Sequence, residues 1–356
     1  MRGRFKKFRL RYIALDSSNP DGSGWDPGPA AANARRAALD PTTLAFIGDL
    51  DSGATAVELP ITNQAGILQI SPTATAEGLT GGGVGAGPGA PYQYYPSGRR
   101  SFVRLVPRDS MQGALLAQMA QRKACAVLAV LDDGSIYGAG LAQIVASQAP
   151  PRGVGVSFTG TLDPRQSDYR SKVHSIKADC LVYAGEPDRR AVRVVTDTAR
   201  LNGRAKVILP DALVSPRFAD PRHGGISAGL AARTTLTGAF AGEDSYPPGG
   251  QWLWRNLLVR NGAIAGQGVI SAYAAAELAV SCEAQSGLLK GLPRRDAMLG
   301  CALGHNHFSR ALGLYRVLLR GDSTVHSYSR LRIAGGRIER AGPLYAPRPI
   351  GTTGSR

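Results

Sequence analysis

The sequence lacks any run of about 18 apolar residues, so no segment is predicted to span a membrane. It also lacks an HExxH motif and a GKS or GKT motif, which removes the usual signatures of zinc proteases and phosphate-binding loops. The basic residues 1–7 are followed by an alternating segment instead of an apolar stretch and a cleavage site, so we expect no export signal in this chain. The 356 residues suffice for two domains with full cores.

Lysine is scarce, since only 7 of the 42 basic residues are Lys and the other 35 are Arg. The formal net charge of +16 raises the question of nucleic-acid binding. However, the Arg residues are scattered, no basic run alternates with aromatic residues, and no zinc-finger, helix-turn-helix or RNA-binding signature occurs. We therefore expect no nucleic-acid partner, and we attribute the charge to an Arg-rich composition, with a cationic surface that would face an anionic cell envelope.

Only four cysteines occur, and none lies in a CxxC motif or at metal-ligand spacing from a histidine. Cys125 and Cys180 each lie near the start of an apolar strand, which favours buried thiols. Cys282 and Cys301 bracket a short helix–loop–helix segment and could either stay reduced or pair in an oxidising compartment. We expect neither a metal site nor a cofactor.

Most of the chain alternates predicted strands with helices of roughly 10–15 residues, which indicates parallel sheets with helices on both faces. The predicted strands are 8–15, 44–49, 67–71, 102–106, 125–131, 153–158, 179–184 and 206–210. The predicted helices are 29–39, 53–65, 110–121, 137–148, 166–175, 187–201, 250–261 and 271–289. Pro60 should kink or split its helix, and Gly335-Gly336 predicts a hairpin between two short strands.

Three motifs resemble functional sites but have simpler explanations. The glycine-rich segment Gly81–Gly87 resembles a phosphate-binding loop, but prolines follow it and no helix can begin there, so we expect a flexible surface loop. Ser227 lies in a GxSxG motif that follows a loop instead of a strand, which argues against a nucleophile elbow. His305 and His307 could share one face of a strand, but a turn is the simpler interpretation. We therefore expect no catalytic residue.

Polar side chains follow the C-terminal ends of several predicted strands. Singly, each is explained as a helix cap or a turn residue. Together they place hydroxyl groups at the edge of the first sheet and carboxylates at the edge of the second, where open parallel sheets bind ligands. That division suits a zwitterion, whose carboxylate would meet hydroxyl and helix N–H groups and whose ammonium would meet an acid. The residues are Ser52, Thr73, Thr75, Tyr137, Glu186 and Asp211.

Segments 46–55, 70–80, 133–141 and 183–185, with their Ser-Gly-Ala-Thr and Ser-Pro-Thr-Ala-Thr motifs, carry a family resemblance. The chain resembles the type I periplasmic solute-binding proteins, close to the leucine/isoleucine/valine-binding branch of ABC transporters. The resemblance implies an α/β fold of two doubly wound parallel-sheet lobes joined by a three-strand hinge. It places residues 1–107 and 240–313 in the N-terminal lobe, residues 108–239 and 314–349 in the C-terminal lobe, and 350–356 in a flexible tail.

The resemblance also implies the roles of the site residues. Ser52, Thr73, Ala74 and Thr75 would hold the carboxylate of an amino acid, Asp211 would take its ammonium, and Tyr137 would cover the ligand. Glu186 stands where relatives often present an aromatic residue, which permits a polar or cationic ligand. The implied protein is a monomeric, extracytoplasmic binding component that closes on an amino acid or related amide and docks on a membrane permease. Two alternatives are a ligand-sensing domain of a receptor or regulator and an α/β enzyme.

The start of the chain departs from the family pattern. Family members begin with one more strand and its loop, whereas this chain opens on a segment that resembles their second strand. The first strand of the N-terminal lobe is therefore expected to be missing. Either the gene start is set too late, in which case the full-length form would carry a signal and a lipid anchor, or the protein is a genuine fragment.

Overall fold

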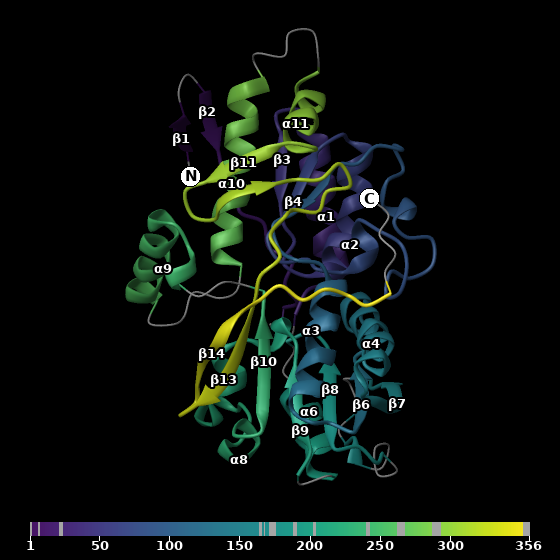
Figure 1. Cartoon of the computed structure of the whole chain (residues 1–356). Helices are drawn as coiled ribbons and strands as arrows, with labels where there is room; N and C mark the ends of the chain where they lie inside the picture. Colours follow the sequence, from purple (N-terminus) through teal and green to yellow (C-terminus); the bar gives the residue numbers. More distant parts are fainter. Residues whose placement is uncertain are drawn as a thin grey trace.

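The computed structural model describes residues 2–5, 8–20, 24–163, 166, 168–170, 176–187, 191–201, 204–239, 243–261, 268–286 and 293–351. Two lobes lie one above the other in Figure 1; the upper lobe holds strands β3 to β5 and the lower lobe holds strands β6 to β10. Both lobes contain a parallel sheet with helices packed against it, which confirms the predicted α/β fold of two lobes.

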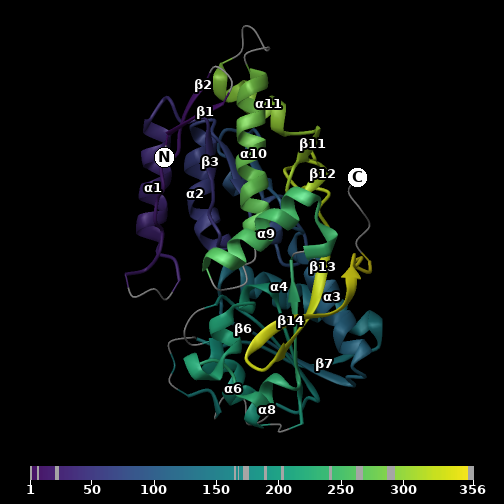
Figure 2. The same cartoon turned by 90° about the vertical axis from the view of Figure 1, so that its left-hand side faces the viewer.

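A three-stranded parallel sheet forms the centre of the upper lobe, in the order β3-β4-β5. Its strands are β3 (Ala45–Ile47), β4 (Leu68–Ser71) and β5 (Phe102–Arg104). The helices beside it are α1 (Pro27–Leu39), α2 (Ser52–Gln64), α10 (Val269–Ser286) and α11 (Arg294–Ala302). Leu68 and Ile70 pack towards α10 and α11 on one face, while Phe102 packs against Leu59 of α2 on the other. Figure 2 shows α1 and α2 on the left of this lobe and α10 and α11 further right.

Three smaller elements complete the upper part of the structure. Helix α9 (Pro248–Asn261) lies apart from the sheet in Figure 1. Strands β11 (Asn306–Ser309) and β12 (Gly313–Arg316) form a separate antiparallel pair.

The sheet of the lower lobe has seven described strands in the order β14-β13-β10-β9-β8-β6-β7. The parallel strands are β6 (Val127–Asp132), β7 (Gly155–Thr161), β8 (Cys180–Ala184), β9 (Lys206–Leu209) and β10 (Thr234–Gly238). Its helices are α3 (Asp109–Arg122), α4 (Ile136–Gln148), α6 (Ala191–Leu201), α7 (Pro216–Ala219) and α8 (Ala228–Ala231). Alternate residues of β8 point to opposite faces: Val182 packs with α3 and α4, and Tyr183 packs with α6.

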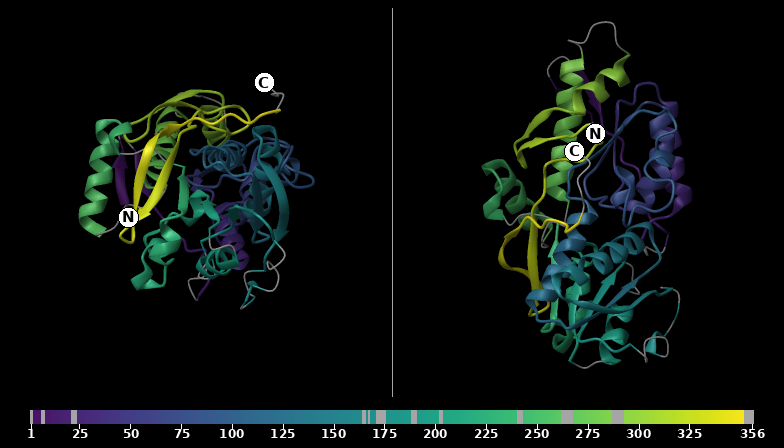
Figure 3. Two further views of the ribbon diagram at one scale, coloured as in Figure 1. Left: turned by 60° about the horizontal axis from the view of Figure 1, so that its bottom comes forward. Right: turned by 45° about the vertical axis from the view of Figure 1, so that its right-hand side comes forward.

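The C-terminal part of the chain returns to the lower lobe as an antiparallel hairpin. Strands β13 (Tyr328–Ala334) and β14 (Arg337–Tyr345) lie at one edge of the sheet, shown in yellow in Figure 3. Gly335 and Gly336 connect them with φ values of 56° and 75°, which suits the tight turn that joins twisted strands. The hairpin predicted at these glycines is confirmed. The chain then reaches α4, where the backbone N–H of Ile350 donates to Gln148 at 2.8 Å.

The predicted strand 8–15 is wrong in its length and its pairing. Strand β2 (Phe8–Arg11) pairs antiparallel with β1 (Arg2–Phe5) and joins neither sheet. The alternating residues Tyr12 and Ile13 that follow are 64% and 40% exposed, so the apolar pattern is not used to fill a core. A hairpin with the adjacent residues closes a much shorter loop than pairing with the sheet, and this lowers its entropic cost.

Of the two outcomes predicted at Pro60, a kink or a split, the split does not occur, because helix α2 is continuous through Pro60. Proline removes one backbone hydrogen bond, but Leu59, Thr62 and Asn63 on either side of it are fully buried or nearly so. Their tertiary packing therefore holds the helix together.

The predicted helix 166–175 lies largely outside the described residues. None of the described helices combines the length and the apolar character needed to cross a lipid bilayer.

Each lobe contains one disulfide bond. Cys125 pairs with Cys180, which corrects the prediction of two buried thiols. The pairing arises because β6 and β8 are neighbours, with Leu128 opposite Cys180, so the chain just before β6 passes beside β8. Cys282 on α10 pairs with Cys301 on α11, so the paired alternative for these two cysteines is the one observed.

The Cys125–Cys180 disulfide is expected to stabilise the lower lobe substantially. It closes a loop with a sequence separation of 55 residues, and a loop of this size implies a loss of about 2–4 kcal/mol in the free energy of unfolding when both cysteines are replaced with alanine. Urea denaturation of the double variant, under non-reducing conditions, measures this loss. The matched double variant of Cys282 and Cys301, whose separation is only 19 residues, should lose less. Equal stability of the Cys125/Cys180 variant and the parent protein would contradict the prediction.

Candidate functional site

The loops that follow β3 and β4 form the upper half of the candidate site. Ser52 is the first residue of α2 and its Oγ accepts a hydrogen bond from the backbone N–H of Ala76 at 3.2 Å. Thr73 Oγ1 donates to the carbonyl of Leu50 at 2.6 Å. These hydroxyl groups tie the two loops together at the C-terminal edge of the sheet, as the sequence predicts. Asp51 precedes α2 without a side-chain capping bond, so its side chain leaves the first N–H groups of the helix uncapped.

Thr75 and Ala74 differ in what they present to a ligand. Thr75 is 2% exposed and its carbonyl accepts from the backbone N–H of Asp109, the first residue of α3. Ala74 uses its own N–H to bond Ser71 Oγ at 2.8 Å, and its carbonyl accepts from Arg104 at 3.1 Å. Ala74 therefore has a fixed structural position behind the loop surface, while Thr75 connects the upper half of the site to the lower.

Tyr137 and Asp211 form the lower half of the candidate site and contact each other directly. Tyr137 lies in the first turn of α4, and its hydroxyl donates to Asp211 Oδ1 at 2.8 Å. The same hydroxyl lies 3.3 Å from Oε1 of Gln112. Burial raises the pKa of Asp211 above its usual value, while hydrogen bonds from Gln112 and Tyr137 lower it. Burial also raises the pKa of Tyr137 well above its usual value, so Tyr137 keeps its proton and acts as the donor.

Glu186 contacts the other lobe through a residue that the sequence prediction missed. Trp25, from the loop before α1, donates its indole N–H to Glu186 Oε2 at 3.2 Å. The indole also packs against Gly53 of α2, since a Cβ added at Gly53 would lie 2.3 Å from a Trp25 ring carbon. On the other side, the backbone N–H of Glu186 donates to Asp133 Oδ2 at 2.7 Å. The sequence offered one indication of this role, namely that Trp25 lies in a loop that follows a predicted strand.

Two further acidic residues that the prediction did not select lie beside the site. Burial, with the charges of Asp49 and Asp133, raises the pKa of Asp51 to about 6. Asp109 is fully buried, and neither of its carboxylate oxygens has a hydrogen-bond partner in the described part of the chain. Burial raises the pKa of Asp109 well above its usual value, and the charge of Asp211 raises it further. In the sequence, these two residues could be found only by their positions, since Asp51 comes shortly after strand β3 and Asp109 shortly after strand β5.

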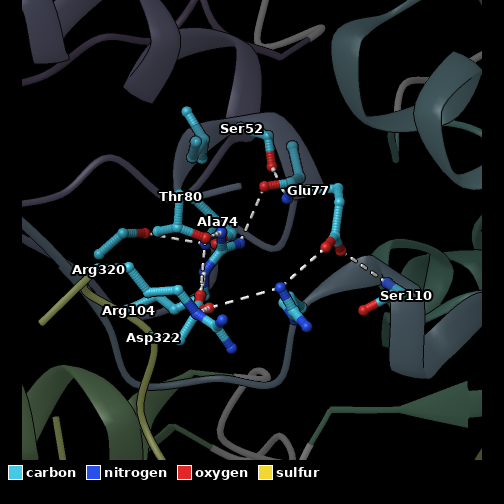
Figure 4. A network of polar contacts seen from close by, with 12 residues as sticks. Ser52, Ala74, Glu77, Thr80, Arg104, Ser110, Arg320 and Asp322 are labelled. Carbon is cyan, nitrogen blue, oxygen red and sulfur yellow. Dashed lines mark hydrogen bonds and ion pairs between the residues drawn. The ribbon is translucent and has the colours of Figure 1, made fainter. Parts of the chain in front are cut away.

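A buried ionic network lies behind the loop that carries Ala74 and Thr75 (Figure 4). Arg104, at the end of β5, is fully buried and donates to Asp322 at 3.0 Å. It also bonds the carbonyls of Ala74 and Ala76, on either side of Thr75. Burial alone would raise the pKa of Asp322, but Arg104 and neighbouring arginines hold it below its usual value.

The same network joins two segments that connect the lobes. Arg108 pairs with Glu77 at 3.0 Å and lies 3.7 Å from Asp322. The backbone N–H of Ser110 donates to Glu77 at 3.0 Å. The chain near Asp322 runs beside β5, because the backbone N–H of Arg104 donates to the carbonyl of Gly321. The network therefore fixes the position of the loop that carries Ala74 and Thr75 relative to the connections between the lobes.

Within Gly81–Gly87, Gly85 and Ala86 are buried, whereas residues 82–84 and Gly87 are exposed, so the prediction of a surface loop is wrong only for Gly85 and Ala86. Gly85 has a φ of 82° and lies against α4, where a Cβ at Gly140 would be 2.5 Å from the Gly85 carbonyl oxygen. Glycine is required at both positions by this close approach. Of the tyrosines that follow, Tyr94 and Tyr95 are buried against the upper sheet.

The remaining motifs have structural roles. Ser227 precedes helix α8 and accepts a hydrogen bond from the backbone N–H of Leu230, which is the geometry of a helix cap. His307 on β11 lies 3.0 Å from the carbonyl oxygen of Ala302. Within the described ranges, no group of three or more His, Cys, Asp or Glu residues is placed to hold a metal ion.

Glu58 of α2 gives the upper lobe a pH-dependent stability. Burial, with the charge of Asp49, raises its pKa from 4.5 to about 9. The folded protein thus holds a proton that the unfolded chain releases above pH 4.5, so stability falls by about 1.4 kcal/mol per pH unit between these two values. Replacing Glu58 with glutamine should remove this slope, because the neutral amide can replace the protonated acid beside Gln69.

Urea denaturation at pH 4 and pH 8 checks the Glu58 prediction. The Glu58→Gln variant should match the parent protein at pH 4 and exceed its stability at pH 8. A variant that is less stable than the parent at pH 8 would show that Glu58 is ionised in the folded protein.

No protein-family model and no curated protein matches the sequence, but many solved structures match the fold. The leucine-binding protein LivK of Thermotoga maritima matches with a TM-score of 0.74 and 16% identity, over 90% of this chain and 85% of that chain. LivJ of Streptococcus pneumoniae, solved with isoleucine, matches with a TM-score of 0.68 and 16% identity over 90% and 85%. A solute-binding protein of Rhodopseudomonas palustris HaA2, solved with p-hydroxybenzoic acid, has a TM-score of 0.69 and 16% identity over 92% and 85%. The chain therefore has the type I periplasmic binding protein fold, as the sequence predicts.

Proposed function

We propose that this protein is the ligand-binding component of an ABC uptake transporter and that it binds an amino acid or related amide between its two lobes. The observation that carries the proposal is the buried Tyr137–Asp211 hydrogen bond in the lower lobe, opposite Thr75 and the uncapped start of α2 in the upper lobe. The solved structures of the same fold support the general role, since their names describe transporter components that bind small molecules.

The upper half suits the carboxylate of the ligand. The first N–H groups of α2 carry the positive end of the helix dipole, and the Ser52 and Thr75 hydroxyls lie at the same strand edge. Thr73 lies beside them and keeps the loop in place through its bond to Leu50. Ala74 would act through its position in this loop.

The lower half suits the ammonium group. Asp211 is 8% exposed and Tyr137 holds one of its oxygens, so an ammonium bound there would form a charge-assisted hydrogen bond in a poorly hydrated place. Tyr137 would also cover the ligand. Glu186, with the Trp25 indole bound to it, would line the side away from Asp211.

Binding across both halves would favour a closed arrangement of the lobes. A ligand that contacts both lobes stabilises the closed form by its extra contacts there. Two contacts between the lobes are already in place, namely Trp25 with Glu186 and Gly85 with Gly140. We propose that the closed form docks on a membrane permease as a monomer. The proposed lobe bounds are 1–107 with 240–313 and 108–239 with 328–349, because β12 (Gly313–Arg316) pairs with β11 and Tyr315 packs in the core of the upper lobe, which corrects the predicted start of the last segment at residue 314.

The disulfide bonds support a location outside the cytoplasm. Disulfides persist in oxidising compartments and are rare in the cytoplasm, and this chain forms one in each lobe. We propose that the protein is extracytoplasmic and held at the cell membrane by a lipid anchor.

A thermal-shift screen against amino acids and their amides tests the proposed function. A ligand that binds only the folded protein raises its unfolding temperature, and a concentration about 100 times Kd adds about 2.7 kcal/mol of stability. We expect at least one amino acid or amide to produce a clear, saturable rise. A screen in which benzoates raise the unfolding temperature and no amino acid does would overturn the amino-acid assignment.

A further inference from the structure

The proposed ligand position is surrounded by more carboxylates than a simple amino acid can neutralise. In the lower lobe these are Asp211, Asp133 and Glu186, which follow strands β9, β6 and β8. Asp51 precedes α2 in the upper lobe, and Asp109 begins α3 where the chain enters the lower lobe. The carboxylates therefore come from both lobes and from the connection between them.

Among these carboxylates, Asp109 indicates most clearly that a positively charged group of the ligand belongs beside them. It is fully buried, and neither oxygen has a hydrogen-bond partner among the described residues. Its carboxylate interacts electrostatically with Asp211, and it lies beside the Thr75 side chain, so it faces the proposed ligand position. Arg104 also acts on Asp109, but its guanidinium is already bound to Asp322 and to two carbonyls. Burial therefore keeps Asp109 protonated while no cation is near, and an ammonium group that reached it would favour the ionised carboxylate.

The second group of carboxylates lies on the opposite side of the proposed ligand position, around Trp25. The charge of Asp133 raises the pKa of Asp51 from the other lobe. Asp133 itself accepts hydrogen bonds from Ser135 and from the backbone N–H of Glu186. Trp25 joins the two sides, since its indole packs against Gly53 of α2 and bonds Glu186. None of the ion pairs formed by Lys or Arg within the described ranges includes Asp51, Asp109 or Asp133. An indole face next to carboxylates is a favourable environment for an organic cation.

We propose that the ligand carries a second cationic group in addition to its α-ammonium, so that the site selects basic amino acids or their amides over uncharged ones. The α-ammonium lies between Asp109 and Asp211, and the second cation lies beside Asp51, Asp133 and the Trp25 ring. This inference rests on the proposed function, because it names the class of amino acid that the same site takes. Like charges close together across the lobes oppose closure, and a ligand with two positive charges removes that opposition.

Calorimetric titration with two matched ligand pairs tests the proposal. L-arginine and L-citrulline have almost the same shape but differ by one charge, and L-lysine and L-norleucine form a similar pair. We expect the charged member of at least one pair to bind at least 10-fold more tightly than its neutral partner. Equal or tighter binding of both neutral members overturns this inference and leaves the proposed function intact. If no amino acid or amide binds, the inference and the proposed function both fail.

Two conservative variants locate the second cation. Asp51→Asn should reduce the preference for arginine over citrulline at least 5-fold, because the ratio of the two affinities separates the cation beside Trp25 from any effect on the carboxylate that both ligands share. Asp109→Asn should weaken both ligands, since it removes a partner of the α-ammonium that they share. Asp168→Asn, which removes an exposed carboxylate of the lower lobe, is the control and should change neither affinity. An unchanged arginine preference in Asp51→Asn contradicts the assignment, and thermal unfolding of each variant shows that it is folded.

Discussion

Replacing Asp211 with alanine is expected to abolish tight amino-acid binding, with a loss of about 3–5 kcal/mol in binding free energy, or a factor of about one hundred to a few thousand. Asp211 is buried and its carboxylate is oriented by the Tyr137 hydroxyl. An ammonium bound there would lose one of the two carboxylates proposed to hold it, the other being Asp109. In the variant, the ammonium of the bound ligand would be a desolvated positive charge without full electrostatic compensation.

The Asp211 prediction is checked by calorimetry with a ligand found in the screen. Asp168→Ala serves as the matched control, because it removes an exposed carboxylate of the same lobe that pairs with Arg170 at the surface. Tyr137→Phe should give a smaller loss, since it removes one hydrogen bond to Asp211 and keeps the aromatic cover. Unchanged affinity in Asp211→Ala would remove Asp211 from the site.

Replacing Arg104 with methionine is expected to lower the free energy of unfolding by about 3–5 kcal/mol, which is the cost of breaking a buried ion pair from one side. Asp322 would remain buried next to Arg108 and Arg320 without its most enclosed partner. The carbonyls of Ala74 and Ala76 would lose their donor as well. Because these carbonyls flank Thr75, ligand affinity should also fall.

Guanidinium denaturation of the Arg104→Met variant measures the loss of stability. Arg170→Met is the control, since Arg170 also pairs with an aspartate but at the exposed surface, where ion pairs contribute little. Its unfolding midpoint should equal that of the parent protein. If both variants unfold at the parent midpoint, the network in Figure 4 does not hold the connections between the lobes together.

The fold could be predicted from the sequence because its pattern is local. Strand β8 reads as a continuous apolar run, and a strand buried on both faces requires such a run. The Gly335-Gly336 turn could be predicted for the same reason, since only glycine adopts both positive φ values without strain. Each of these features is determined by a few adjacent residues.

The missed features depend on which segments become neighbours in space. The Cys125–Cys180 disulfide requires β6 to lie beside β8, and the sequence of neither strand determines which strand it pairs with. The contact of Trp25 with Glu186 joins residues 161 positions apart in different lobes. The packing of Gly85 against Gly140 has the same origin, and in isolation the segment has the composition of a loose loop.

The candidate site was predicted in part. Tyr137 and Asp211 are hydrogen-bonded to each other, as expected for residues at the same sheet edge. The participation of Asp51 and Asp109 could not be predicted from residue type alone, because a carboxylate at a helix start is usually a cap. Only the three-dimensional structure shows that Asp51 makes no capping bond and that Asp109 is fully buried.

A crystal structure of the protein with a bound amino acid tests the central claim most directly. We predict that the ligand lies between the lobes, with its ammonium within hydrogen-bond distance of Asp211 and its carboxylate at the first turn of α2 near Ser52 and Thr75. A ligand bound elsewhere, or bound between the lobes with its carboxylate towards Asp211, would contradict the account.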